Sequence, residues 1–399
     1  MLAALLVAHV AFGLLAMTIC IPSMQDWLGQ FAATQTAVQV SFGGYIAGYG
    51  FLQLVYGPVS DRIGRRPVLL AGLFIACSAS LMAALANELW LLNLSRVVQG
   101  AGCAAGAVVG RAMVQDLFQG TGRTRVMAWI GVAMGVCPPV AMLIGGYMHA
   151  SYGWRANFIL LAGLAAVLTL ITWRLLPRED RNASGAMERR SWRHVMHDYG
   201  SLFKNADFRA YIWILAGAVG TFYIFLGGAP QVLANYGLQP QEIGWYMVFP
   251  SVAYIFGNLS LQRLLRLGVP ERRLMHAGQL LGVLGPALVF VGALIGLDTP
   301  AAAVVPMFLL GFGHGLLIPP ALVATVALMT GLAGAAAAVV GVSQQLVGAL
   351  GGVVVGWLPL TGAAYFGALM LLLSGLGGWV YLRMQRSAGR GDAGHAPLG

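Results

Sequence analysis

The chain has 399 residues, of which 59% are hydrophobic and only 9% are charged, and its formal net charge at pH 7 is +10. So little charge excludes an ordinary soluble domain of this length, which needs a more polar surface. The basic excess does not indicate a nucleic-acid-binding protein either, because the lysines and arginines are scattered among segments between apolar stretches rather than gathered in one patch.

Apolar stretches long enough to cross a hydrocarbon core of about 30 Å recur along the whole chain. We therefore predict an all-α membrane protein with twelve transmembrane helices. The first stretch follows Met1 directly, without the basic segment that begins a cleaved signal peptide. The helices are expected at about residues 2–22, 36–57, 67–86, 89–112, 125–149, 155–176, 209–233, 241–265, 272–296, 301–327, 333–358 and 361–382.

The basic residues predict how these helices are oriented. Arg96 falls inside a helix and Arg155 at the start of one, whereas the other 21 of the 23 lysines and arginines fall in alternate loops. Such loops face the cytoplasm in membrane proteins. We expect a multi-pass protein of the cytoplasmic (inner) membrane with both termini cytoplasmic, and with its basic loops at 62–66, 111–125, 174–209, 263–273 and 383–390.

One long hydrophilic segment divides the chain in two. We expect an N-terminal six-helix bundle at 1–176, a cytoplasmic linker at 177–208, a C-terminal six-helix bundle at 209–384 and a cytoplasmic tail at 385–399. The run from Gly257 to Arg273 is a degenerate echo of the basic loop near residue 60, which favours an internal repeat. The alternative is a basic loop that reflects membrane orientation alone.

The hydrophilic run between the second and third helices reads Gly57-Pro58-Val59-Ser60-Asp61-Arg62-Ile63-Gly64-Arg65-Arg66-Pro67. Its glycines permit tight turning, and Pro67 suits the first position of a helix. Asp61, the only acid of the run, is expected to accept charge-assisted hydrogen bonds from the arginines, and Asp116, just past the fourth helix, lies within their reach. The run therefore predicts a latch that holds one conformation of the protein, and the alternative is a simple membrane anchor. The residues of the predicted latch are Gly57, Asp61, Arg62, Gly64, Arg65, Arg66 and Asp116.

A single arginine stands inside the fourth helix. Arg96 lies about 10 Å from the start of that helix at 1.5 Å per residue, and an arginine in hydrocarbon is a functional candidate by default. Asn93 and Gln99, at i−3 and i+3, can share its helix face. The alternative is a structural arginine whose donors are satisfied by backbone carbonyl groups.

Glycine repeats indicate close helix packing in lipid. Gly102, Gly106 and Gly110 form one GxxxGxxxG pattern, and Gly348, Gly352 and Gly356 form another. The four cysteines, Cys20, Cys77, Cys103 and Cys137, lie in predicted helices at irregular spacing, so we expect buried thiols rather than disulfides or zinc ligands. We expect no metal site and no cofactor.

The run 57–67 closely resembles the signature loop between helices 2 and 3 of major facilitator superfamily transporters. The segments 92–102, 111–118, 153–158 and 311–319 narrow the resemblance to the bicyclomycin/chloramphenicol-resistance group of twelve-helix drug:proton antiporters, over essentially the whole chain. The resemblance implies two pseudosymmetric six-helix bundles. It also implies that the second and eleventh helices face each other, which would set Gly44 and Gly48 against Gly348, Gly352 and Gly356.

The fifth helix carries a segment similar to the antiporter motif of drug exporters. In that motif a proline usually stands three residues before a Gly-Gly pair, and here Met142 occupies its place. Prolines and glycines in this segment are expected to bend the helix and let backbones approach closely. The residues concerned are Gly135, Pro138, Met142, Gly145 and Gly146.

Proton coupling is where the chain departs most from these relatives. They tend to carry an aspartate in the first helix four residues before a proline, and that position is Thr18 here, before Pro22. His9 and His314 are the other titratable candidates inside helices, although a lone helical histidine is more often structural. Tyr223 and neighbouring aromatic residues of the seventh helix are candidates to line an apolar cavity.

These features predict a secondary transporter that is not an enzyme, because the sequence offers no nucleophile–base pair. The partners expected are a small amphipathic drug or metabolite, protons and the lipid bilayer, around a monomer whose halves alternate in exposing a site at their interface. A facilitator or uptake carrier without proton antiport is one alternative, since Met142 and Thr18 weaken the antiporter pattern. A non-transporting membrane sensor on the same scaffold is another.

Overall fold

The computed structural model describes residues 1–399 apart from 177–191, 298, 330–331, 358–361 and 394–399. The described part of the chain consists of helices joined by short turns and contains no strand. The elements are α1 (Leu2–Thr18), the short 3₁₀ helix η1 (Ile21–Ser23), α2 (Asp26–Gln30), α3 (Gln35–Ile63), α4 (Arg65–Ala84), α5 (Leu89–Leu117), α6 (Gly120–Tyr152), α7 (Arg155–Leu175), α8 (Trp192–Leu202), α9 (Ala206–Asn235), α10 (Pro240–Arg266), α11 (Glu271–Leu294), α12 (Pro300–Val304), α13 (Met307–Ala327), α14 (Ala333–Trp357) and α15 (Ala363–Ala393).

Twelve of these helices have 17 or more residues, which confirms the expected all-α membrane fold. Ten of the twelve contain a stretch that is long and apolar enough to cross a membrane. The remaining two, α3 and α10, are as long as the others but are together richer in glutamine, tyrosine and serine. Their length is that of membrane-crossing helices, and each packs along long helices that are apolar enough to span: α3 on α5 and α14, and α10 on α6 and α13.

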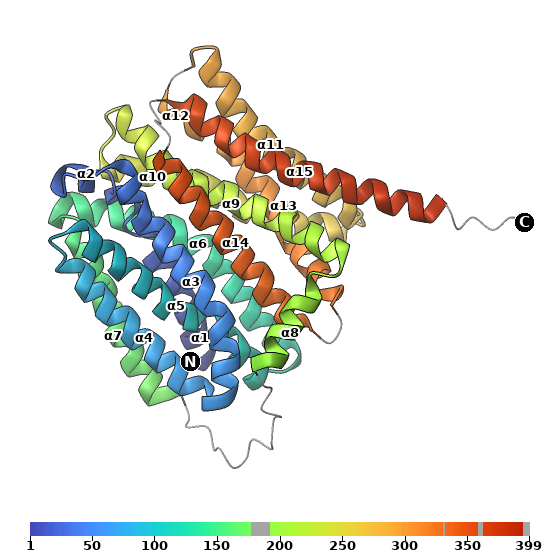
Figure 1. Ribbon diagram of the computed structural model, residues 1–399, viewed down its shortest axis with the longest axis horizontal. Coiled ribbons are helices and arrows are strands. Elements are labelled where there is room, and N and C mark those ends of the chain that lie inside the picture. Colours follow the sequence, from blue (N-terminus) through green and yellow to red (C-terminus); the bar gives the residue numbers. More distant parts are fainter. Residues whose placement is uncertain (177–191, 298, 330–331, 358–361, 394–399) are drawn as a thin grey trace, which may run out of the picture.

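The packing contacts divide the long helices into two bundles, one made of α1 and α3–α7 and the other of α9–α11 and α13–α15. In Figure 1 the first bundle lies toward the lower left, and α11 and α15 of the second lie toward the upper right. In the N-terminal half, α5 packs against α3, α4 and α1, α4 packs against α7, and α1 also contacts α6. The C-terminal half repeats this pattern, because α13 packs against α10, α11 and α9. Among the ten apolar spans the four most buried are α1, α5, α9 and α13, which therefore form the centre of the molecule.

Two helix pairs join the halves: α3 packs against α14, and α6 packs against α10. We call these two contacts the seam. Glycine allows the close approach, because a Cβ built on Gly43 would lie 3.0 Å from the carbonyl oxygen of Ala349, and one on Gly146 would lie 2.8 Å from that of Pro240. Gly352 does lie against Gly43, but Gly44 and Gly48 face Val97 of α5 within the same half, so that part of the expectation is wrong.

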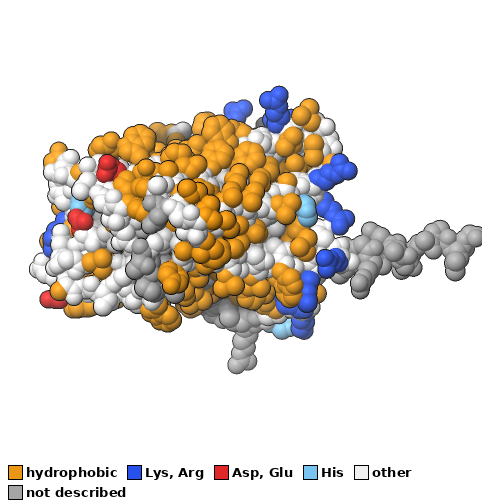
Figure 2. Space-filling model, turned by 90° about the horizontal axis from the view of Figure 1, so that it is seen from above, with side chains coloured by type: hydrophobic (Ala, Val, Ile, Leu, Met, Phe, Trp, Pro, Cys, Tyr) orange, Lys and Arg blue, Asp and Glu red, His pale blue; other side chains and the backbone are white. Residues whose placement is uncertain are grey.

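The charges separate the two ends of the molecule. In Figure 2 most of the visible lysines and arginines lie at one end, beyond a broad apolar belt. This end, which we call the arginine-rich end, carries the C-terminus of α3 and the N-terminus of α4, and the equivalent ends of α10 and α11. The opposite, charge-poor end carries η1 and α2.

The expected hydrophilic loop at 57–67 is almost entirely helical. Helix α3 continues through Pro58 to Ile63, and only Gly64, with φ 101°, interrupts the chain before α4 begins at Arg65. Proline leaves the carbonyl four residues earlier without its donor, and the hydroxyl of Tyr199 in α8 lies 3.5 Å from that oxygen, on Leu54. Of the two glycines expected to turn the chain, Gly64 does so and Gly57 is an ordinary helical residue.

Several other helix boundaries also differ from those expected from the sequence. Pro67 is the third residue of α4 rather than its first, and Asp116 lies within the last turn of α5 rather than beyond it. The expected linker contains α8, and its residues 177–191 lie outside the described part of the chain. Helix α15 runs past the expected membrane boundary, because its arginines do not stop a helix that has left the apolar layer.

Candidate functional site

The guanidinium of Arg96 is the buried charge at the centre of the N-terminal half. Its side chain is fully buried, and it donates to the carbonyl oxygens of Ala16 at 2.8 Å and Met17 at 3.1 Å. These carbonyls belong to the last turn of α1, where no helical N–H follows to bind them. Helix α1 stops there because Pro22, in η1, has no N–H to offer. Arg96 therefore caps the negative end of α1, which is how a cation is held here without a carboxylate.

Three more side chains complete what we call the Arg96 cluster, which is Arg96, Gln99, Ser80 and Tyr45. Gln99 accepts from Arg96 at 2.5 Å and donates to the hydroxyl of Ser80 on α4 at 2.7 Å. The ring of Tyr45, on α3, has its centroid 4.3 Å from the guanidinium carbon, within cation–π range. Its hydroxyl donates to the carbonyl oxygen of Gly13 in α1 at 2.7 Å. The cluster thus connects α1, α3, α4 and α5.

Asn93 does not share this cluster. Its amide donates to the carbonyl oxygen of Ala37 at 3.0 Å and its oxygen accepts from Ser41, so it binds α5 to α3 instead. Three residues along a helix advance about 300°, and the remaining 60° turns Asn93 toward α3. Of the two residues expected beside Arg96, only Gln99 binds it.

The two buried histidines differ in how they are held. The ring nitrogens of His9 contact the carbonyl oxygen of Leu5 at 2.8 Å and the hydroxyl of Thr172 at 3.1 Å, so both sides of the ring are engaged. His314 lies on α13 against Gly282 of α11 and makes no hydrogen bond to a described residue. Thr18, at the position where relatives tend to carry an aspartate, donates to the carbonyl oxygen of Leu14 at 2.9 Å.

Tyr223 lies between the halves rather than on an open wall. Its hydroxyl donates to the side-chain oxygen of Gln345 on α14 at 2.7 Å, and its ring meets that of Phe42 on α3 edge to face, with centroids 6.2 Å apart. A Cβ on Gly50 of α3 would lie 2.5 Å from that of Gln345. Tyr223 therefore belongs to the seam, where an aromatic residue of one half contacts the other half.

Glycines that make the same contacts in both halves show which residues of the two halves correspond. A Cβ on Gly102 would lie 2.6 Å from both the amide nitrogen of Ala76 and the carbonyl oxygen of Gly72. In the other half, a Cβ on Gly313 would lie 2.9 Å and 2.5 Å from the same atoms of Gly282 and Gly278. A shift of 211 residues thus relates α5 to α13, and a shift of 206 relates α4 to α11.

A second pair of glycines, one in α5 and one in α13, shows the same shift of 211 residues. A Cβ on Gly100 would lie 2.1 Å from the carbonyl oxygen of Tyr45, and one on Gly311 would lie 2.0 Å from that of Pro250. In this register the positions equivalent to Arg96, Gln99 and Ser80 are apolar. They are Met307, Leu310 and Pro286.

The arginines between α3 and α4 bind neighbouring elements. Arg65 forms an ion pair with Asp61 in the preceding helix, a 3.1 Å ion pair with Asp116 of α5, and a 2.6 Å bond to the hydroxyl of Ser60. Arg66 instead donates to the carbonyl oxygen of Trp173 on α7 at 2.5 Å. Arg62 is exposed at the surface of this corner. The aspartates thus bracket Arg65, and one guanidinium ties together three helix ends.

The antiporter-like segment lies within α6, which stays helical through Pro138 and Pro139. A Cβ on Gly145 would lie 1.8 Å from the carbonyl oxygen of Ile19, so only glycine fits against the end of α1. Gly146 faces the carbonyl oxygen of Pro240 on α10 in the same manner, whereas Gly135 faces the side chain of Ile255 on that helix. Met142 is fully buried, and its own carbonyl oxygen lies against Gly244 of α10. The segment is therefore a packing surface shared by the end of α1 and the seam.

A family model described as Major Facilitator Superfamily matches residues 4–352. The chain belongs to the major facilitator superfamily. It is 31% identical over 373 residues to the Multidrug resistance protein D of Escherichia coli (strain K12), which covers 92% of both chains. It is 28% identical to the Chloramphenicol resistance protein of Pseudomonas aeruginosa over 73% of this chain and 68% of that one.

Solved structures of other transporters share the fold at low sequence identity. The D-xylose-proton symporter aligns with a TM-score of 0.72 at 14% identity, covering 94% of this chain and 96% of that one. A bacterial homologue of the human lysosomal transporter Spinster, in an inward-facing conformation, aligns with a TM-score of 0.74 at 15% identity and 96% coverage of both chains. Family and fold together make the chain a membrane transporter and not an enzyme.

Sequence reasoning missed several polar residues of this superfamily member. Gln39 of α3 donates to the carbonyl oxygen of Gly227 on α9 at 2.7 Å, and Thr36 donates to that of Gly356 on α14 at 2.6 Å. Together with Gln345 these side chains hydrogen-bond across the seam or at it. A signal was available in the sequence, because glutamine and threonine side chains in membrane helices hydrogen-bond across helix interfaces.

Proposed function

We propose that this transporter exports small amphipathic drugs or metabolites from the cytoplasm by alternating access of its two halves, driven by protons. The observation that carries the proposal is the Arg96 cluster, a fixed buried cation with no carboxylate beside it among the described residues. A cation in such a place favours binding of polar or anionic substrate atoms and disfavours a second positive charge nearby. A guanidinium does not release its proton in proteins, so another group must carry the transported proton.

The link from this cation to the seam supports alternating access. Arg96 holds the last carbonyls of α1, and the chain then enters η1, which contacts α9 and α10 of the other half. Substrate atoms that compete for the guanidinium would loosen the end of α1. Loosening would then reach η1, which contacts the other half at the charge-poor end.

We assign the arginine-rich end to the cytoplasm by the positive-inside rule, in the cytoplasmic (inner) membrane with both termini inside. The described seam supports an inward-facing state. Hydrogen bonds cross it near the charge-poor end, from Thr36 to Gly356 and from Trp245 to Tyr147 at 3.2 Å. Toward the arginine-rich end of α6, Gly131 and Met134 are exposed although they share a helix face with buried Met142.

Proton coupling is assigned to His314. It is the buried histidine whose ring makes no hydrogen bond to a described residue, whereas His9 is bound on both sides. A histidine changes charge near neutral pH, which suits a proton gradient. The boundaries 1–176 and 209–384 for the working halves, and a monomer as the working unit, are part of the same proposal.

The test is transport in everted membrane vesicles that contain the protein. Radiolabelled chloramphenicol and a pH-gradient dye are followed together, with vesicles lacking the protein as the control. Uptake into everted vesicles together with dissipation of the proton gradient is expected. Substrate flux without proton movement would replace the proposal with a facilitator, which Thr18 and Met142 favour. Absence of flux for a broad set of compounds would replace it with a sensor.

A further inference from the structure

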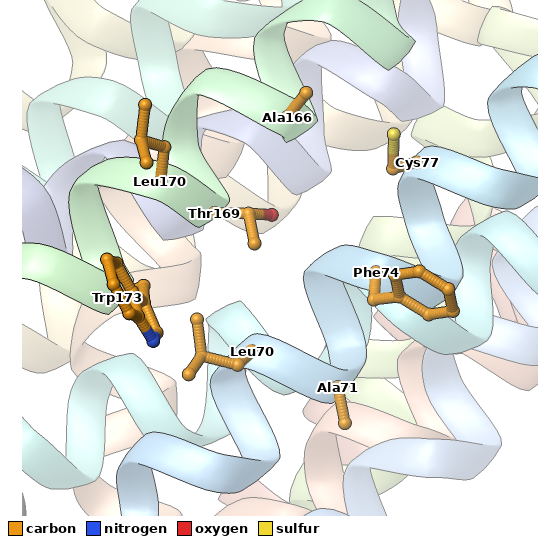
Figure 3. Close-up of a pocket in the computed structure, with 8 residues that line it drawn as sticks. All are labelled: Leu70, Ala71, Phe74, Cys77, Ala166, Thr169, Leu170 and Trp173. Carbon is orange, nitrogen blue, oxygen red and sulfur yellow. The ribbon is translucent and has the colours of Figure 1, made fainter.

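An apolar groove runs along the outer surface of the N-terminal half between α4 and α7, with a volume of about 620 Å³ (Figure 3). Each helix contributes residues at i, i+3 or i+4, and i+7, which is a single stripe of a helix face. Small side chains form part of the lining, and Phe74 and Trp173 are 68% and 55% exposed at its sides. The lining is Leu70, Ala71, Phe74 and Cys77 from α4 and Ala166, Thr169, Leu170 and Trp173 from α7.

The groove lies within one leaflet of the membrane. Leu70 and Cys77 are about 10 Å apart along α4 at 1.5 Å per residue, whereas the whole hydrocarbon core is about 30 Å thick. The groove begins one turn after Arg66 and ends near the middle of α4, where the thiol of Cys77 lies 3.4 Å from the carbonyl oxygen of Ala162. The groove therefore fits within one leaflet, which is about 15 Å thick, on the arginine-rich side.

Positive charge stands at the outer end of the groove. Arg66 is anchored there by its 2.5 Å bond to the carbonyl oxygen of Trp173, and the exposed Arg174 follows directly in the chain. The aspartates of this corner, Asp61 and Asp116, both bind Arg65. Within the described residues the two arginines at the groove thus keep their charge uncompensated, at the depth where phosphate groups of lipids lie.

We propose that the groove binds one acyl chain of a phospholipid from the arginine-rich leaflet, with the lipid phosphate held by Arg66 and Arg174. The lining offers almost no polar group, which suits a hydrocarbon chain and excludes a hydrated ligand. The projecting rings of Phe74 and Trp173 keep another helix away, because helices that associate in lipid approach through small residues. The site belongs to the N-terminal half alone and is independent of the direction of transport.

The experiment is native mass spectrometry of the purified full-length protein in detergent, titrated with dioleoylphosphatidylglycerol and, separately, with dioleoylphosphatidylcholine. In the variant Ala166→Leu a larger side chain fills the groove from α7, and we expect the tightest lipid adduct to disappear. The matched control is Ala128→Leu, the same change at an exposed alanine of α6, which should retain it. Thermal unfolding of each variant shows that all remain folded.

A second variant tests the charge at the groove. Arg174→Gln should weaken phosphatidylglycerol binding about fivefold, since one arginine near an anionic lipid contributes about that factor, and phosphatidylcholine binding should change less. Equal adducts in wild type, Ala166→Leu and Ala128→Leu would overturn the proposal. So would a dimer that Ala166→Leu converts to a monomer, because the groove would then be an interface between two copies of the chain.

Discussion

The two halves of the molecule share their helix packing and differ in chemistry at the centre. Glycines at matching positions bring α5 against α3 and α4, and α13 against α10 and α11, at nearly the same distances. Yet Arg96 and Gln99 of the first half correspond to Met307 and Leu310 of the second. The backbone contacts therefore set the fold of each half, while the buried charge is a separate addition to one of them.

The strongest test of this difference is Arg96→Ala. Transport should fall to background, because the carbonyls of Ala16 and Met17 lose their donor, at a cost of about 1–3 kcal/mol for each buried unsatisfied group. Arg96→Lys should recover little, since an ammonium lacks the planar fork that serves several acceptors. Flux is measured in vesicles and divided by the amount of folded protein.

The matched control is Met307→Ala in the other half. It should cost about 2–5 kcal/mol of stability, as large-to-small core changes do, while the folded fraction keeps its flux. Equal loss of flux per folded molecule in both variants would break the comparison, because the cation would then have no role that its apolar counterpart lacks.

A second pair of variants tests the shared packing. Gly100→Ala and Gly311→Ala each place a Cβ about 2 Å from a carbonyl oxygen, so each should destabilise the protein by about 1–3 kcal/mol or more. Thermal unfolding in detergent should show similar decreases for the two. Gly163→Ala on α7 is the control, since a Cβ there meets nothing within 4 Å. A decrease in only one half would refute the proposed register.

The connections between α3 and α4 and between α10 and α11, both at the arginine-rich end, also differ in charge. The shift of 206 residues takes Arg65 to Glu271, so the sign at this position is reversed in the second half. Asp61→Asn should lower transport severalfold, because it removes an exposed ion pair worth about 1 kcal/mol or less, while Glu271→Gln should leave it near wild type. Initial rates at matched expression decide this, and normal rates for Asp61→Asn would leave the corner a topological role only.

The smallest effect on downhill flux is expected at His314. His314→Gln should flatten the dependence of transport on pH and abolish proton-driven accumulation, while downhill flux without a proton gradient stays within about twofold of wild type. His9→Gln serves as the control, because that ring is held by Leu5 and Thr172 and should not follow pH in the same range. An unchanged profile for His314→Gln would remove it from the coupling mechanism.

Much of the fold followed from the sequence, because apolar length and alternating basic loops depend on the membrane and not on long-range contacts. The details that failed depend on such contacts. Helix α3 runs through Pro58, and neighbouring helices in membrane proteins supply the groups that make such a proline tolerable.

The site could be predicted only as far as residue types allow. Arg96 and Gln99 could be predicted to be neighbours because they lie on one helix. The carbonyl groups of Ala16 and Met17 belong to another helix and are free to bind Arg96 only because that helix ends there, which the sequence does not reveal. The correspondence between Arg96 and Met307 could not be predicted either, because the equivalent positions of the two halves that make these contacts share glycines but few other residues.

The unusual polarity of α3 and α10 has a consequence for biosynthesis. Spontaneous partitioning from the translocon depends on apolarity, and these two helices lack the apolar stretch that the other ten long helices possess. Each must therefore be retained through neighbours that are already in the bilayer, such as α5 for the glycine face of α3 once both have emerged. A damaging substitution in either helix would then first lower the amount of protein in the membrane, because the protein would be degraded during insertion before it could transport anything.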